Sequence, residues 1–148
     1  MISKAFLRIN KEIKLLSLSF LLIFFGYNAV QQYLTTYFST LGLQDLGFRS
    51  LILIFLSFFL SGPIGAIVVS KYGAKKSMVI ASLFYFLFIA SLTSGILFIY
   101  FTSVLVGFAA SLLWTGQNSY LVKASDEKTY GENSGFFNSA LTLGSACG

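Results

Sequence analysis

The chain has 148 residues, of which 56% are hydrophobic and only 10% are charged, and its mean hydropathy is +0.81. Because about a quarter of the residues are charged in ordinary soluble domains, this composition excludes a typical soluble protein and indicates an integral membrane protein. The ten basic residues outnumber the five acidic ones, but they lie in short clusters between apolar runs. We therefore expect them to face a membrane surface and not nucleic acid.

The first apolar run, residues 15–38, is expected to form a retained membrane helix. It follows a basic segment, residues 1–14, in which Glu12 is the only acid. A signal peptide also begins with positive charge, but its apolar core has only about 7–15 residues and ends at a small-residue cleavage site. This run is longer and has no such site, so a cleaved signal peptide is the alternative and not the main interpretation.

Four polar side chains recur at i, i+3, i+4 and i+7 within this helix and therefore share one face: Asn28, Gln31, Gln32 and Thr35. Side-chain amides that faced lipid tails would lack hydrogen-bond partners. We therefore expect this face either to hydrogen-bond to other helices inside a bundle or to line a water-filled cavity. The pattern does not separate these two roles.

An outer loop is expected over residues 39–50, which contain two glycines, Asp45 and Arg49. A second apolar run, residues 51–70, is long enough to span a bilayer. The sequence therefore predicts a loop followed by a second membrane helix.

Within the second helix, Gly62, Ala66 and Ser70 form a small-residue stripe at i, i+4 and i+8. Such a stripe lets another helix approach the backbone closely. Pro63 removes a backbone donor nearby and is expected to bend the helix. Helix packing is the expected role of these residues.

Residues 77–122 carry no charged side chain. As one helix they would be about twice as long as the roughly 30 Å hydrocarbon core of a bilayer, so the stretch must fold back. Thr93, Ser94 and Gly95 are the only concentration of turn-forming residues near its middle. Two helices are therefore expected, over residues 77–92 and 96–122, joined by a short hairpin.

The fourth helix carries a second candidate set of cavity-lining residues near its carboxyl end: Trp114, Gln117 and Asn118. A fifth apolar segment, residues 133–148, would span only about 24 Å as a helix, which is less than the bilayer core. We therefore expect the chain to be a truncated portion of a longer protein, with one transmembrane domain over residues 1–148.

All basic residues except Arg49 fall on one side of these helices, and by the positive-inside rule that side faces the cytoplasm. The amino terminus is expected on the same side. So is a tight turn between the second and third helices, whose candidate motif residues are Ser70, Gly73, Lys75 and Lys76.

Catalytic and metal chemistry have little support in the sequence. No charged residue lies inside a predicted span, and the chain has no histidine and one cysteine. A disulfide framework and an ordinary Cys/His metal site are therefore excluded within the chain. No acid is placed to activate a hydroxyl within the membrane, so we expect no catalysis, metal or cofactor.

The order of these parts, with the Gly-Ala-Lys-Lys-Ser turn at residues 73–77, resembles the amino-terminal half of the major facilitator superfamily, although Ser70 stands where that family has an acid. The chain is more similar to its ion channel regulatory, or Unc-ninety-three-like, branch. The similar segments are residues 28–34 (NAVQQYL), 72–77 (YGAKKS), 113–121 (LWTGQNSYL) and 133–137 (NSGFF). The resemblance implies an all-α polytopic transmembrane bundle, a partial major-facilitator-type fold with four full helices and part of a fifth.

What the resemblance implies about function is a non-enzymatic multi-pass protein of the channel-regulatory branch. Its expected partners are the lipid bilayer and another membrane protein such as a channel. The first alternative is a solute transporter of the superfamily, with a small solute as its ligand. A small four-helix assembly or scaffold subunit is the second alternative, and the coding sequence after Gly148 would distinguish it from the other two.

Overall fold

Five helices account for the regular structure of the computed structural model, which describes residues 9–148 apart from the side chains of two residues, 35 and 44. The helices are α2 (Lys11–Thr40), α3 (Gln44–Tyr72), α4 (Ala74–Ser91), α5 (Ile96–Lys123) and α6 (Tyr130–Cys147). The described part of the chain contains no strand, and α2 to α5 are long and apolar enough to cross a membrane. This confirms the expected all-α membrane bundle. Two of the basic residues that support the predicted orientation, Lys4 and Arg8, lie outside the described residues.

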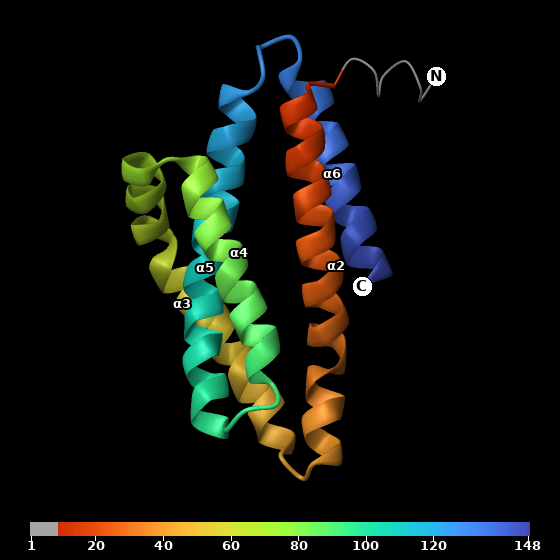
Figure 1. Cartoon of the computed structure of the whole chain (residues 1–148), viewed down its shortest axis with the longest axis vertical. Helices are drawn as coiled ribbons and strands as arrows, with labels where there is room; N and C mark the ends of the chain where they lie inside the picture. Colours follow the sequence, from red (N-terminus) through yellow and green to blue (C-terminus); the bar gives the residue numbers. More distant parts are fainter. Residues whose placement is uncertain (1–8) are drawn as a thin grey trace.

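The helices form a pair and a trio (Figure 1). α2 packs mainly on α6, whereas α3 and α4 both pack on α5. α5 is the most enclosed of the five, because residues along nearly its whole length are buried. The amino end of α2, the amino end of α4 and the carboxyl end of α5 lie at the same end of the bundle (Figure 1).

The first helix begins before the predicted residue 15. The Asn10 side chain accepts a hydrogen bond of 3.2 Å from the Glu12 backbone N–H, which caps the helix so that it starts at Lys11. Glu12 lies in the first turn, where a negative charge is favoured by the helix dipole. The basic segment therefore continues directly into the membrane helix.

The predicted outer loop over residues 39–50 was wrong except over residues 41–43, because α2 continues to Thr40 and α3 begins at Gln44. The turn is confined to the residues around Gly42, whose φ of +72° suits glycine. Asp45 and Arg49 form an ion pair of 3.1 Å one helical turn apart, with the acid in the first turn of the helix. The residues that resembled a loop are therefore a helix start.

The turn between α3 and α4 is also shorter than predicted. Gly73, with φ of +89°, is the only residue between the two helices. Lys75 and Lys76, which the sequence placed in a cytoplasmic loop, lie instead in the first turn of α4. A single left-handed glycine is sufficient because it reverses the chain without a steric cost.

Close packing of α3 on α5 uses a different stripe from the predicted Gly62, Ala66 and Ser70. Nothing lies within 4 Å of a Cβ built on Gly62, and Ala66 and Ser70 are exposed. A Cβ on Gly65 would instead lie 2.7 Å from the Ser111 Oγ of α5. The small residues were recognised correctly, but the face of the helix was not.

Candidate functional site

Three of the predicted polar residues of α2 border one hollow. The hollow has a volume of about 520 Å³ and is lined from α2, α3 and α6 by Phe24, Asn28, Gln31, Gln32, Leu51 and Ser145. The side chain of the fourth predicted residue, Thr35, is not described. The α2 face named from its periodicity therefore includes three residues that line one concave surface.

The hollow lies at membrane depth. Gln31 is about 14 Å before the carboxyl end of α2 at Thr40, given the rise of a helix, so its amide lies within a helix of membrane-spanning length, in the half nearer that end. Among the described residues, none of the side chains of Asn28, Gln31 and Gln32 has a hydrogen-bond partner. Side-chain amides at this depth can therefore receive a hydrogen bond from another molecule.

Ser145 was missed because it reaches the hollow only through the contact of α6 with α2. A Cβ on Gly144 would lie 2.7 Å from the Leu21 carbonyl oxygen, and a Cβ on Gly148 would lie still closer to the Phe25 carbonyl oxygen. These glycines let α6 lie directly on α2, which brings Ser145 to the hollow. The sequence spaces Ala140, Gly144 and Gly148 four residues apart, which marks a face for close helix contact, but it does not show which helix packs there.

The second predicted set does not join the first. Trp114 packs against Phe24 and Phe20 with ring centroids 5.5 and 6.2 Å apart, so it belongs to the aromatic core. Gln117 is buried and Asn118 is exposed, and neither lines the hollow. α2 and α5 therefore contribute their polar residues to different surroundings.

The predicted turn motif lies where α3 ends and α4 begins. The Ser70 hydroxyl donates to the Ile67 carbonyl at 2.8 Å, so it is bonded within its own helix. The Lys75 ammonium lies 5.4 Å from the centre of the Tyr120 ring, and Lys76 is exposed. Gly73 forms the turn itself. No cluster of His, Cys, Asp and Glu able to hold a metal ion occurs within the described residues.

A bundle of membrane-length helices, with a hollow bordered by three side-chain amides, defines the class, a polytopic α-helical membrane protein. Residues 42–145 match the family described as ion channel regulatory protein UNC-93, and the chain belongs to this family. This confirms the resemblance found in the sequence. No solved structure matches the chain.

Named relatives show the same relationship. The chain is 36% identical over 113 residues to the UNC93-like protein 3 of Arabidopsis thaliana, covering 76% of this chain and 23% of the relative. It is 32% identical over 130 residues to the UNC93-like protein MFSD11 of Xenopus tropicalis, covering 85% and 29%, and the protein of Xenopus laevis gives the same values. The chain thus spans about a quarter of the length of these curated relatives.

Proposed function

We propose that this protein is a non-enzymatic membrane protein that associates with another membrane protein, such as an ion channel, and regulates it. The family to which the chain belongs is described as ion channel regulatory. The observation that carries the proposal is the row of side-chain amides on α2, which border the hollow without a partner among the described residues. A helix of a partner protein that offered hydrogen-bonding groups would satisfy them.

Each hydrogen bond of this kind contributes a modest amount. Interhelical hydrogen bonds in membranes average about 0.6 kcal/mol, and two of them would therefore change an association constant about eightfold. That contribution is too small to hold a complex by itself, but it is large enough to select one partner helix over another. The amides would thus supply specificity for the partner helix, and apolar contacts with that helix would supply the remaining affinity.

We also propose the orientation that the basic residues favour, with the amino terminus in the cytoplasm. One end of the bundle carries Lys11, Lys75 and Lys123 together. Arg49 lies at the other end and is paired with Asp45. An unequal distribution of this kind is what the positive-inside rule describes.

Transport of a small solute is the second candidate, and the size of the hollow favours it. Sites for small molecules occupy about 300–1,000 Å³, and the hollow has about 520 Å³. The same amides would then hydrogen-bond to a solute. Both proposed functions use the hollow, but they predict different experimental results.

The test replaces Gln31 and Gln32 by Leu in the full chain, with Thr36→Val as the matched control. Thr36 is an exposed polar residue of the same helix and does not line the hollow. Candidate channels are co-expressed, and both co-purification and current density are measured. The double variant should reduce co-purification about eightfold at an unchanged protein level, and the control should not.

Uptake into proteoliposomes is measured in parallel with a panel of small solutes. Regulation is the wrong interpretation if the double variant retains full channel binding while a solute flux present in the wild type disappears. If neither channel binding nor flux depends on Gln31 and Gln32, the hollow is not the functional site under either proposal.

A further inference from the structure

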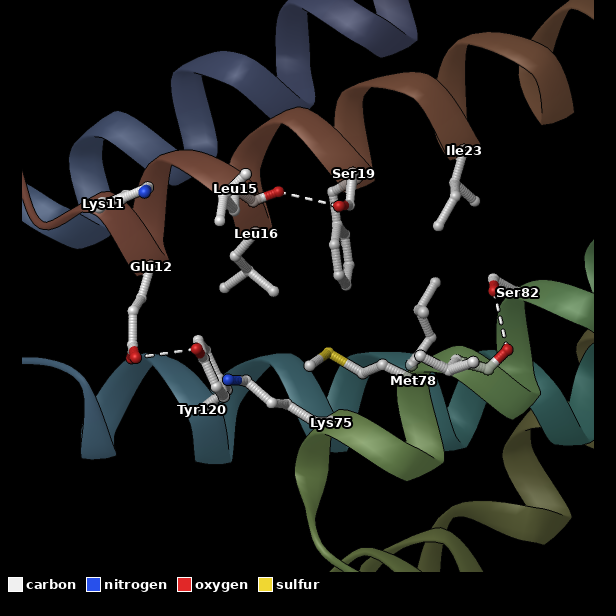
Figure 2. A pocket seen from close by; sticks show the side chains of 13 residues that line it. Lys11, Glu12, Leu15, Leu16, Ser19, Ile23, Lys75, Met78, Ser82 and Tyr120 are labelled. Carbon is white, nitrogen blue, oxygen red and sulfur yellow. Dashed lines mark hydrogen bonds between the residues drawn. The ribbon is translucent and has the colours of Figure 1, made fainter.

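A second cavity, similar in volume to the hollow, lies nearer the amino end of α2. It has a volume of about 530 Å³ and runs between α2 on one side and α4 and α5 on the other (Figure 2). Its walls are mainly hydrocarbon: Leu16, Phe20, Ile23, Met78, Val79 and Leu113. We refer to this cavity as the α2–α4 groove.

The deep part of the α2–α4 groove offers no free hydrogen-bonding group from its two serines. The Ser19 hydroxyl donates to the Leu15 carbonyl at 2.8 Å, and the Ser82 hydroxyl donates to the Val79 carbonyl at 2.8 Å (Figure 2). Both hydroxyls are therefore satisfied within their own helices. A ligand that fills this part must be apolar.

The mouth of the groove is charged. Lys11 lies in the first turn of α2 and Lys75 in the first turn of α4, and both line the groove together with Glu12 and Tyr120. The Tyr120 hydroxyl donates to a Glu12 carboxylate oxygen at 3.0 Å, and the Lys75 ammonium lies 5.4 Å from the centre of the Tyr120 ring (Figure 2). Two ammonium groups and one carboxylate leave one net positive charge, which complements one phosphodiester.

The length of the groove matches one membrane leaflet. From Lys11 to Ile23, α2 rises about 18 Å, and one leaflet of the hydrocarbon core is about 15 Å deep. The charged mouth therefore lies at the level of lipid headgroups when the apolar floor is near the centre of the bilayer. An extended acyl chain has this reach.

We propose that the α2–α4 groove binds an anionic phospholipid, with one acyl chain between α2 and α4 and the phosphate between Lys11 and Lys75. The acyl chain moves from one apolar environment to another, so it contributes little selectivity. The charge at the mouth must supply the preference. The bound lipid belongs to the leaflet at the end where α2 begins, which is the cytoplasmic leaflet in the orientation proposed above.

Trp114 provides an intrinsic probe, because it is the only tryptophan of the chain and its ring packs against Phe20 on the groove wall. The full chain is reconstituted into vesicles of phosphatidylglycerol and phosphatidylcholine in equal amounts. In one sample only the phosphatidylglycerol is brominated, and in the other only the phosphatidylcholine. The surface charge is the same in both, so stronger quenching by brominated phosphatidylglycerol measures selective binding.

The variant Lys11→Gln/Lys75→Gln should lower the lipid preference on the order of fivefold for each lysine, because each basic group near an anionic surface contributes about that much. Its matched control is Lys123→Gln/Lys128→Gln, which removes two exposed lysines outside the groove, the first of them at the same end of the bundle, and should keep the preference. Lys11→Arg/Lys75→Arg keeps the charge and should keep the preference too. Loss of quenching in the glutamine variant with retention in the arginine variant shows an effect of charge and not of misfolding.

Three outcomes would overturn the proposal. Equal quenching by the two brominated lipids in the wild type means that the groove does not select an anionic lipid or is filled by protein. An equal loss in both glutamine variants means that surface charge alone is responsible. Abolition of the preference by an excess of inorganic phosphate means that the lysines bind phosphate and that the acyl chain has no role.

Discussion

Gly107 of α5 should tolerate no side chain, because α3 crosses directly over it. A Cβ built on Gly107 would collide with the Ile54 carbonyl oxygen and would lie 2.9 Å from the Phe58 backbone nitrogen. Backbone atoms cannot rotate away as the end of a flexible side chain can. Gly107→Ala should therefore push α3 and α5 apart.

The magnitude follows from a comparison with Gly62→Ala. Gly62 also lies inside a helix, but nothing is within 4 Å of a Cβ built on it. Both substitutions gain about 1 kcal/mol of helix propensity. Only the first adds an overpacking cost of about 1–3 kcal/mol, so Gly107→Ala should be less stable than Gly62→Ala by about 2 kcal/mol.

Thermal unfolding of the full chain in a mild detergent measures this difference. A change of 2 kcal/mol corresponds to roughly 4–8 °C in Tm for a chain of this size. If Gly107→Ala melts at the same temperature as Gly62→Ala or above it, α3 does not lie on Gly107 as described. Close contact at a glycine would then not be what holds this pair of helices together.

Two further predictions concern the α4–α5 hairpin and the topology. Thr102→Val removes a buried hydroxyl that lies 2.7 Å from the Ser91 hydroxyl. The free energy of unfolding, measured by titration with a denaturing detergent, should fall by about 0.6–1.7 kcal/mol. An unchanged stability would mean that this pair of hydroxyls does not hold the hairpin together. In a Cys147→Ser background, a cysteine at Ser94 should react with an impermeant maleimide from outside cells, and one at Ser125 only after permeabilisation. The opposite pattern would reverse the proposed orientation.

The parts of the fold that were predicted correctly follow from the cost of placing charge and polar groups in lipid. The uncharged residues between Lys76 and Lys123 had to fold back, and α4 indeed ends at Ser91 while α5 begins at Ile96. The same cost singled out the amide face of α2, three residues of which border the hollow, while their role stays a prediction. This cost acts on each helix separately, so its consequences can be predicted without knowledge of the partner helix.

The parts that were missed depend on which helix lies against which. A stripe of small residues indicates that a backbone is approached closely, but Gly65 and not Gly62 meets Ser111 because the crossing of α3 and α5 determines the contact face. Asp45 was interpreted as a loop residue, although an acid in a first helical turn is equally well placed. The same residues are compatible with either contact face of α3 and with either a loop or a helix start at Asp45. The three-dimensional arrangement of the helices decides between these possibilities.

The arrangement of the two cavities bears on the choice between association and transport. The α2–α4 groove lies nearer the amino end of α2 than the hollow does, and Phe24, which lines the hollow, and Tyr27 lie along the helix between the groove wall and the amides. Phe24 packs on Trp114 at 5.5 Å and Tyr27 on Tyr85 at 5.0 Å, so rings from three helices pack together between α2, α4 and α5 at the level just beyond the groove. A solute that passed along this seam would have to displace these rings, whereas a partner helix could reach the amides of the hollow without moving them. Within the described chain this separation favours association as the role of the hollow.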